Sequence, residues 1–366
     1  MKRVRIHVKP NSYDAIIQSG LLNQAGENLA ELMAGSTSRC FVITVPNVRK
    51  HWESALADSL KASGFENTIL EMRDGERYKT MAAVEDLAAR LIKLGADRTS
   101  TLIALGGGVV GDVTGLLASL YMRGLALVHV PTTFLAQVDS SIGGKTGVNL
   151  AAGKNLLGTY YHPRAVLIDP AVLATLAERD FRSGLYEALK CGVIRNAEIF
   201  NFMEKERERI LRRDPSALEW LIAQCVKVKA AVVAEDEREH DLRRVLNFGH
   251  TIGHALEAET SYKYFLHGEA VAWGMVAASM IAAGMHRTSS ETAQRIIAAV
   301  LAYAPLPKVE IRSKNIVRRL LSDKKTTHGV TPFILPREIG RVEITNDVPE
   351  RAVLQAVEEL RYLSRA

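Results

Sequence analysis

The strongest constraint on the fold is a run of glycines between an apolar strand and an apolar helix. Residues 101–105 are typical of a strand, and Gly106, Gly107, Gly108 and Gly111 follow before a helical pattern begins. Glycines at such a junction let backbone N–H groups approach a phosphate at the helix N-terminus. The spacing matches the dinucleotide pattern GxGxxG, but no acidic residue lies about 20 residues further on to bind a ribose. On spacing alone, a nucleotide site and a plain tight turn both stay open.

Short apolar runs alternate with helical patterns in the first half of the chain. The predicted strands are residues 3–9, 40–45, 67–72, 101–105, 125–130 and 165–168. Such alternation is typical of a mainly parallel sheet with helices packed on it. From about residue 180 the patterns become long and helical: 184–194, 198–211, 216–236, 269–285 and 290–302. We therefore expect a Rossmann-like α/β domain at residues 1–180 and an all-α domain at residues 181–366.

The composition is that of an ordinary globular protein and argues against several functions. The net charge of +6 is spread along the chain, whereas nucleic-acid binders gather theirs in a patch. The longest uncharged run, residues 270–285, is shorter than the ~20 residues that span a bilayer. The N-terminus lacks the apolar stretch of a signal peptide. Cys40, Cys191 and Cys225 are isolated, which indicates a reducing compartment, so we expect a cytoplasmic protein.

Three residues of the helical half could hold a metal ion. Glu187, His250 and His267 each stand beside glycines in apolar segments. Two imidazoles and one carboxylate form a normal catalytic zinc site. His254 follows His250 by one helical turn and shares its face, so one could ligate while the other transfers protons. Each histidine taken alone is more often structural, and no Glu follows His250 as in the metalloprotease motif HExxH.

Basic side chains recur in glycine-rich or apolar segments. They are Lys145, Lys154, Lys190, Lys229 and Arg243, with two more after Asp323. A lone lysine is usually solvated, but a converging group suits a polyanionic substrate, because phosphate and carboxylate need charge-assisted donors. Residues 74–79 and 131–133 each follow a strand and would suit polar cofactor groups. The charged run 235–241 is either solvated surface or the source of an acid or base, Glu239.

Taken together and in order, these motifs resemble the dehydroquinate synthase family of the sugar-phosphate cyclase superfamily. The resemblance rests on DGERYK, GGGVVGD, QVDSSIGGKTGVN, GKN, Glu187-x-x-Lys190, EDERE, LNFGHTIGHALE, LHGEAVAWGM and DKK, and it covers nearly the whole chain. It implies a lyase of the shikimate pathway, which leads to chorismate and the aromatic amino acids. That reaction converts 3-deoxy-D-arabino-heptulosonate 7-phosphate into 3-dehydroquinate and phosphate. It proceeds by transient oxidation with NAD, phosphate elimination, re-reduction and an intramolecular aldol closure.

The resemblance also implies a role for particular residues. NAD, which is not consumed, would be bound by Asn47, Asp74, Gly75, Glu76, Arg77, Tyr78, Lys79, Gly108, Val109, Val110, Gly111, Asp112, Thr132, Thr133, Lys145, Lys154, Val172, Leu173, Ala174 and Thr175. Zinc or cobalt would be held by Glu187, His250 and His267. Substrate would be bound by Arg123, Asp139, Lys145, Asn155, Lys190, Lys229, Arg243, Asn247, His254, His267, Lys324 and Lys325. The catalytic residues would be Glu239 and His254, which transfer protons, with Lys145, Lys190, Arg243 and Asn247. Arg123 would act from the other subunit of a homodimer.

Other readings remain open at this point. Members of the same superfamily cyclise other sugar phosphates to valiolone-type or inosose-type products. Asn247 and the Asp323-Lys-Lys segment favour the dehydroquinate branch, because its substrate carries a carboxylate. A metal-dependent polyol dehydrogenase has a similar two-domain plan, but it leaves the lysines unexplained. A non-catalytic relative is disfavoured because every expected ligand position is filled.

Overall fold

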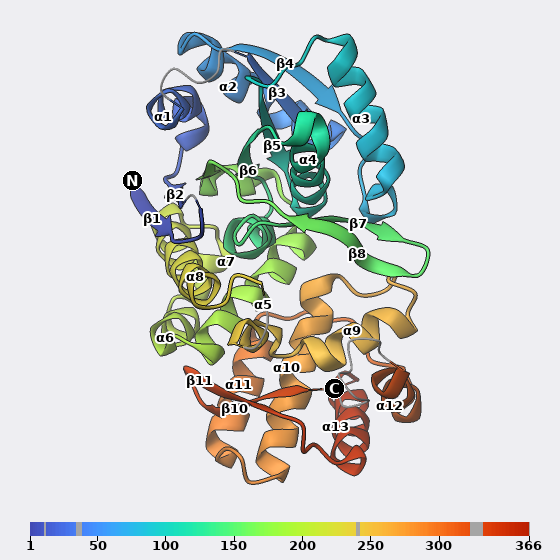
Figure 1. Ribbon diagram of the computed structural model, residues 1–366. Helices are drawn as coiled ribbons and strands as arrows, with labels where there is room; N and C mark the ends of the chain where they lie inside the picture. The colour runs from blue at the N-terminus through green and yellow to red at the C-terminus, as the bar shows by residue number, and fades with distance from the viewer. Residues whose placement is uncertain (11, 34–38, 239–241, 323–331, 366) are drawn as a thin grey trace. The chain divides into compact units, whose positions relative to one another are not determined.

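The chain forms two compact units in a computed structural model that describes residues 1–10, 12–33, 39–238, 242–322 and 332–365 (Figure 1). Unit one comprises Met1–Ala177 and Arg213–Glu237, and unit two comprises Glu178–Arg212 and Arg238–Ala366. The helix of residues 215–235 thus belongs by its contacts to the first unit, although segments of unit two flank it in sequence. The division at residue 180 stays a prediction about domains.

A seven-stranded sheet forms the centre of unit one. Its strands are β1 (Lys2–Ile6), β2 (Tyr13–Ile17), β3 (Arg39–Thr44), β4 (Glu66–Glu71), β5 (Thr101–Gly106), β6 (Ala126–Pro131) and β9 (Ala165–Ile168). They lie in the order β1-β2-β9-β6-β5-β3-β4. All neighbours are parallel except the edge strand β1, which pairs antiparallel with β2. The predicted Rossmann-like, mainly parallel sheet is confirmed.

Helices cover both faces of this sheet. Along β3, Phe41 and Ile43 face one hydrophobic core with α3 (Met81–Lys93) and α4 (Gly108–Leu120). Val42 faces a second core with α1 (Ala25–Leu32) and α2 (Pro46–Ala62). Burial on both faces explains why the central strands are continuous apolar runs.

A separate hairpin packs against α4. Its strands are β7 (Lys145–Leu150) and β8 (Gly153–Tyr160), which pair antiparallel. The helix α8 (Pro215–Glu235) packs against β1 and β2 in the same unit.

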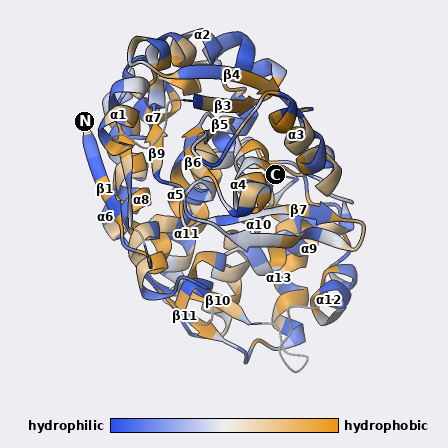
Figure 2. Cartoon of the chain, turned by 45° about the horizontal axis from the view of Figure 1, so that its top comes forward, coloured by the Kyte–Doolittle hydropathy of each residue, from blue (hydrophilic) through white to orange (hydrophobic). Residues whose placement is uncertain are grey.

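Unit two is mainly helical. Its helices are α5 (Glu178–Ile194), α6 (Ala197–Lys205), α7 (Arg207–Leu211), α9 (His250–Glu259), α10 (His267–Gly284), α11 (Ser290–Ala302), α12 (Ser313–Ser322) and α13 (Glu350–Leu363). In α10, 14 of 18 residues are buried, as expected for a core helix whose only acidic residue, Glu269, is paired with Arg179. The surface helix α12 instead alternates hydrophilic and hydrophobic residues (Figure 2) and buries only its apolar face, which includes Ile316 and Leu320.

The prediction of an all-α domain needs one correction. Unit two contains the antiparallel pair β10 (Phe333–Glu338) and β11 (Arg341–Thr345). Pro336 stands inside β10, and proline normally argues against a strand unless the strand lies at an edge. In a two-stranded sheet every strand is an edge, so the proline is tolerated. Among the described residues, no helix is both long and apolar enough to cross a bilayer.

Candidate active site

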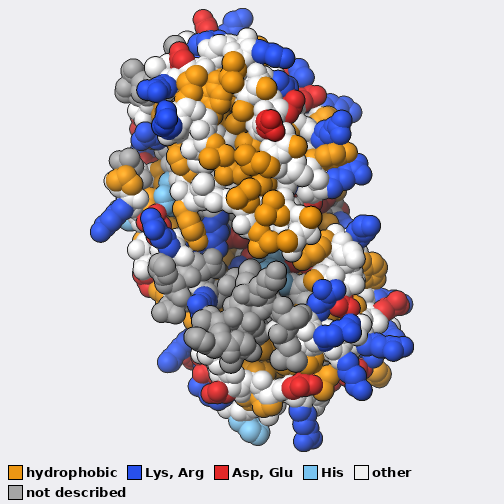
Figure 3. All heavy atoms as spheres, turned by 45° about the vertical axis from the view of Figure 1, so that its right-hand side comes forward, with side chains coloured by type: hydrophobic (Ala, Val, Ile, Leu, Met, Phe, Trp, Pro, Cys, Tyr) orange, Lys and Arg blue, Asp and Glu red, His pale blue; other side chains and the backbone are white. Residues whose placement is uncertain are grey.

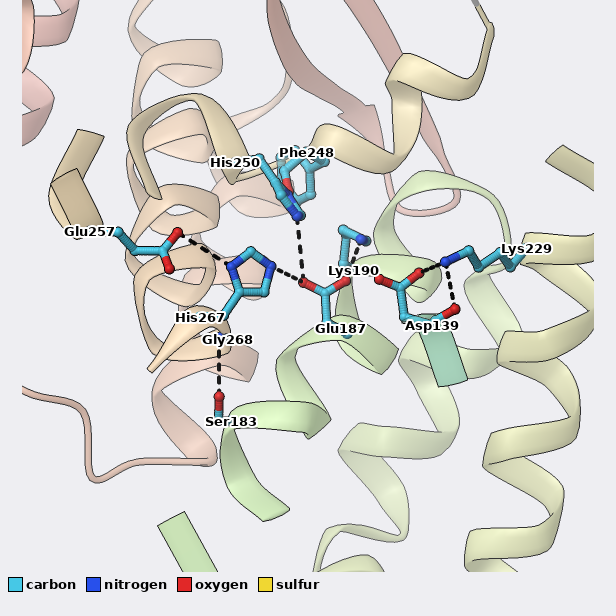
Figure 4. Close-up of polar contacts among 10 residues, drawn as sticks. All are labelled: Asp139, Ser183, Glu187, Lys190, Lys229, Phe248, His250, Glu257, His267 and Gly268. Carbon is cyan, nitrogen blue, oxygen red and sulfur yellow. Dashed lines mark hydrogen bonds and ion pairs between the residues drawn. The ribbon is translucent and has the colours of Figure 1, made fainter. Parts of the chain in front are cut away.

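Three potential metal ligands lie together in unit two. Glu187 projects from α5, while His250 and His267 are the first residues of α9 and α10. The Nε2 atoms of both histidines lie 3.8 Å from Oε1 of Glu187 (Figure 4). Within the described chain, this buried oxygen has no hydrogen-bond partner. Donor atoms at this spacing can each lie about 2.1 Å from one ion. The residues present therefore fit the metal that the motifs predict.

Hydrogen bonds at Nδ1 orient both imidazoles toward Glu187. Nδ1 of His250 lies 3.2 Å from the carbonyl oxygen of Phe248, and Nδ1 of His267 lies 3.3 Å from Oε2 of Glu257. Both partners are acceptors, so each Nδ1 carries the proton and each Nε2 presents a lone pair. This is the tautomer that a metal ligand requires.

The two histidines differ in their tendency to take a proton. Burial lowers the pKa of His250 well below its usual value, and the neighbouring charges of Lys190, His267 and His254 act in the same direction. Burial also lowers the pKa of His267, but the hydrogen bond and charge of Glu257, with the charge of Glu187, more than offset it. The net pKa of His267 is raised. His250 is thus held neutral, as metal binding requires.

Glycines allow the three ligand-bearing helices to approach closely. A β-carbon on Gly268 of α10 would lie 1.8 Å from the carbonyl oxygen of Ser183 on α5. One on Gly274 would lie 1.8 Å from the carbonyl oxygen of Gly249, which precedes α9. The N–H of Gly268 also donates to Oγ of Ser183 at 3.1 Å (Figure 4). These contacts fix where α9 and α10 begin, and therefore where His250 and His267 stand.

Unit two also contains three residues that were predicted to bind substrate, namely Lys190, Arg243 and His254. Lys190 is 2% exposed, and its ammonium donates to Oε2 of Glu187 (Figure 4). Arg243 is fully buried in the 3-10 turn Leu242–Asn247, which packs against α5 and leads into α9. The ring of His254 lies 5.3 Å from that of His250 and 5.9 Å from that of His267, measured between centroids. The structure thus places the ring of His254 beside the two histidines that contact Glu187.

In unit one, the predicted nucleotide residues meet at the carboxyl ends of β5 and β6. The N–H of Thr132 donates to the carbonyl of Gly106 at 3.0 Å. A β-carbon on Gly107 would lie 2.9 Å from Cγ2 of Thr133, and one on Gly108 would lie 3.1 Å from Oγ of Ser140. Thr133 and Ser140 therefore lie against the glycines at the start of α4, where larger residues would not fit. This is the edge of a parallel sheet at which ligands bind.

A buried polar network joins three other predicted segments of unit one. The ammonium of Lys79, 4% exposed, donates to Asp112 on α4 and to Asn155 on β8. Asn47 donates to Asp74 at 3.4 Å. Lys79 thus links the segment 74–79 to the helix that follows the glycines. These hydrogen bonds join residues 33 and 76 positions apart along the chain.

The remaining predicted residues of unit one are more scattered. Lys229 on α8 is buried and pairs with Asp139, whose backbone carbonyl it also contacts at 2.6 Å (Figure 4). Lys145 begins β7 and is exposed, and Lys154 lies partly buried on β8. Arg123 is exposed on the turn after α4.

Some predicted contacts are limited by burial or lie outside the described residues. Val110, Val172 and Leu173 are at most 2% exposed, so only their backbone atoms could face a cofactor. Ala174 and Thr175 are exposed, and Thr175 accepts a hydrogen bond from Trp52. Glu239, Lys324 and Lys325 lie outside the described residues.

Two supporting residues escaped the sequence interpretation. Glu257 contacts His267, and Ser140 faces Gly108. Glu257 follows His254 by three positions on the same helix, which is a usable signal. For Ser140 the signal is absent, since only the folded chain brings it to the glycine turn.

Comparison with known proteins now identifies the family. Residues 69–183 match the family described as 3-dehydroquinate synthase N-terminal, and residues 184–326 match 3-dehydroquinate synthase C-terminal. The chain belongs to the 3-dehydroquinate synthase family. A 3-dehydroquinate synthase from Koribacter versatilis (strain Ellin345) is 61% identical over 364 residues, which is 100% of this chain and 99% of that relative. The family predicted from the motif order is confirmed, and with it the synthase function that the family implies.

Solved structures related to this family share the whole fold. A 2-deoxy-scyllo-inosose synthase complexed with carbaglucose-6-phosphate, NAD+ and Co2+ has a TM-score of 0.87 at 29% identity, over 98% of this chain and 99% of that chain. A 2-epi-5-epi-valiolone synthase from Streptomyces hygroscopicus subsp. jinggangensis 5008, with NAD+ and Zn2+ bound, also has a TM-score of 0.87, at 32% identity over the same shares.

Proposed function

We propose that the chain converts 3-deoxy-D-arabino-heptulosonate 7-phosphate into 3-dehydroquinate and phosphate. The observation that carries this is the triad in unit two, where two Nε2 atoms face a buried carboxylate oxygen that has no hydrogen-bond partner among the described residues. The same triad would serve any cyclase of the superfamily. Identity of 61% to a 3-dehydroquinate synthase, against 29% and 32% to the inosose and valiolone synthases, favours the dehydroquinate branch.

We propose that NAD and one divalent ion, Zn2+ or Co2+, are the bound cofactors, as in the two solved relatives. When bound, NAD supplies a transient oxidation and reduction of the substrate, and the ion polarises substrate oxygens. The glycine-rich start of α4, Thr132, Thr133 and the Lys79 network would hold NAD. Glu187, His250 and His267 would hold the ion.

The cationic side chains would bind and orient the substrate. Lys190, Lys229 and Arg243 are all buried, so their charges act in a medium that screens them weakly. Phosphate and carboxylate groups form charge-assisted hydrogen bonds with such donors. In the free protein Lys190 and Lys229 are paired with Glu187 and Asp139, which keeps them in place until substrate arrives. His254 and Glu239 are proposed to move protons, with Asn247 and Lys145 as further contacts.

The decisive experiment measures phosphate release together with nicotinamide absorbance. With catalytic amounts of NAD and a divalent ion, the heptulosonate phosphate should release one phosphate per molecule, and no NADH should accumulate. Sedoheptulose 7-phosphate and glucose 6-phosphate should react at least 100-fold more slowly. Stoichiometric NADH without phosphate release would identify a polyol dehydrogenase instead, and faster reaction of another sugar phosphate would move the chain to another cyclase branch.

We further propose a cytoplasmic homodimer in which Arg123 serves the site of the partner subunit. Hydrophobic side chains gather on one face of unit one (Figure 3), and Leu120, Met122, Leu156 and Leu157 are exposed in that unit. An exposed apolar group next to an arginine suits contact with a second copy. The three cysteines are buried free thiols, which supports a reducing compartment.

Mixing two inactive variants tests the role of Arg123. If Arg123 acts across the dimer, Arg123→Ala and Lys190→Ala subunits should together regain up to about a quarter of wild-type activity, because one hybrid site is then intact. Sites built within one chain predict no recovery even when subunit exchange is shown by a tag.

A further inference from the structure

A buried carboxylate stands behind one of the three metal ligands. Glu257 of α9 is 4% exposed, and its Oε2 lies 3.3 Å from Nδ1 of His267, the first residue of α10. In Figure 4 Glu257 and Glu187 lie on opposite sides of the His267 ring, each facing one of its nitrogens. Neither the motif pattern nor the reaction assigns a role to this residue.

Because burying a carboxylate is costly, we expect the hydrogen bond between Glu257 and His267 to have a structural or functional role. An isolated buried charge costs several kcal/mol, so such groups are retained where a donor meets them. Here the donor is the imidazole N–H, and the bond fixes both the tautomer and the plane of the ring. The lone pair of Nε2 then points at Oε1 of Glu187, 3.8 Å away.

The second histidine of the triad achieves the same orientation differently. His250 donates to the backbone carbonyl of Phe248, two residues before it. His267 is the more exposed ligand, with 33% of its side chain accessible against 10% for His250. The more exposed ring, that of His267, is therefore oriented by a side chain of the neighbouring helix, whereas that of His250 is oriented by the local backbone.

Glu257 also belongs to a second possible ligand group, with His254 and His267. An ion held there through Nδ1 of His267 would need that nitrogen deprotonated and free of its hydrogen bond. The 3.3 Å contact instead has the geometry of an imidazole N–H donating to a carboxylate. A single ion held by Glu187 and the Nε2 atoms of His250 and His267 is compatible with both contacts of His267, to Glu187 and to Glu257.

We propose that Glu257 is a positioning residue that orients His267 and thereby raises the affinity of the site for a divalent ion. The proposal rests on the proposed function only in taking Glu187, His250 and His267 as the ligands. It predicts that metal affinity depends on the acceptor at position 257 and that the site holds one ion.

The test measures binding of Zn2+ and Co2+ to full-length metal-free protein by competition with a chromophoric chelator. Glu257→Leu removes the acceptor and should weaken binding 10- to 100-fold, the usual effect of losing such a partner. Glu257→Gln keeps a neutral acceptor, and its affinity for the metal should fall by about three- to tenfold. The absorption bands of bound Co2+ should shift in both variants, as expected for a rotated ligand.

Glu259→Leu is the matched control. Glu259 lies on the same helix and pairs with Arg319, away from the ligands. This variant should bind metal within about twofold of wild type. If Glu257→Leu does not fold, Glu257→Gln decides alone. Wild-type affinity in the Gln variant, or equal losses at positions 257 and 259, would overturn the proposal.

Stoichiometry separates the remaining possibilities. Two ions per wild-type chain and one per Glu257→Gln chain would make Glu257 a ligand and overturn a positioning role. Failure of the wild type to release phosphate would overturn the proposed function but would leave the affinity series interpretable.

Discussion

At the scale of single residues, the site depends on buried charges that stabilise one another. Glu187 is 1% exposed and Lys190 is 2% exposed, and they form an ion pair one helical turn apart. The sequence allowed both to be singled out, because charged residues in an apolar helical stretch are unusual. Their pairing was open, since the spacing permits contact but does not require it.

Replacing Lys190 with Met should destabilise the metal-free protein far more than the metal-bound protein. Without the ammonium, the buried Glu187 loses its ion-pair partner, and removing one partner of a buried ion pair costs about 3–5 kcal/mol. A bound divalent ion would compensate that charge. Urea unfolding of wild type and Lys190→Met, with and without saturating Zn2+, measures the loss of stability in the metal-free and the metal-bound protein. Equal destabilisation in the two states would show that the ion does not contact Glu187.

His129 should make the protein less stable as the pH falls from about 6.5 to 4. It is buried on β6 beside the glycine turn, and burial lowers its pKa to about 4. Between about pH 6.5 and pH 4, His129 binds a proton in the unfolded chain but not in the folded chain, so acid favours unfolding. A shift of this size corresponds to about 2–3 kcal/mol at pH 4.5.

The comparison of wild type with His129→Gln isolates this contribution. Urea unfolding between pH 7.5 and pH 4.5 should show a smaller loss of stability in the variant, by about 2–3 kcal/mol. Parallel curves for the two proteins would mean that His129 is hydrated in the folded state.

At the scale of elements, tight helix contacts determine where the ligands stand. Gly268 leaves no room for a methyl group against Ser183, whereas a β-carbon on Gly284, at the end of the same helix, would meet no side chain or other element of the described residues within 4 Å. A periodicity argument identifies α10 as a buried helix but cannot separate these two glycines. Only the packed structure tells which of them is required.

The pair Gly268→Ala and Gly284→Ala tests this directly. Gly268→Ala should destabilise by about 1–3 kcal/mol through overpacking and should weaken metal binding by displacing His267. Gly284→Ala should be neutral or stabilise by up to about 1 kcal/mol, through helix propensity. Thermal melts and chelator competition measure both properties. Similar effects at the two positions would contradict a role for the contact with α5.

The elements missed by sequence reasoning share a cause. The central strands of the sheet and the helices α5, α6, α10 and α11 of unit two have long, regular patterns and were predicted. β7 and β8 contain glycines and polar residues, and their pairing depends on partners such as Thr146 and Thr159, whose hydroxyl groups meet at 2.8 Å. β2 contains the buried Asp14, which pairs with Arg5 and breaks the apolar pattern. In each case contacts with the paired strand outweigh local preference.

At the scale of the whole molecule, the assignment of α8 to unit one could not be read from its sequence. A helix of 21 residues has the same pattern whichever unit it joins. The structure ties it to unit one through Lys229, which pairs with Asp139, and through Glu219, which accepts from the N–H of Ser19 at 2.7 Å. These contacts join residues 90 and 200 positions apart.

Metal removal should lower the melting temperature of the protein in proportion to the affinity of the site. The three ligands come from three helices, so an ion that binds only the folded chain stabilises it by mass action, by about 4 kcal/mol at 1,000 times its Kd. Calorimetry across a series of Zn2+ concentrations measures the shift. Glu187→Gln should abolish the concentration dependence, and a chelated wild type that melts unchanged would refute a metal at this triad.

The turn after α4 has a consequence for anyone who wishes to engineer this enzyme. Met122, Arg123 and Gly124 have φ angles of 48°, 69° and 126°, and the first two would be more relaxed as glycines. A non-glycine residue in the left-handed region costs roughly 1–2 kcal/mol. A search for thermal robustness would therefore select glycine at position 123. That substitution would remove the guanidinium that we propose reaches the neighbouring subunit. The protein would gain stability and lose catalytic activity.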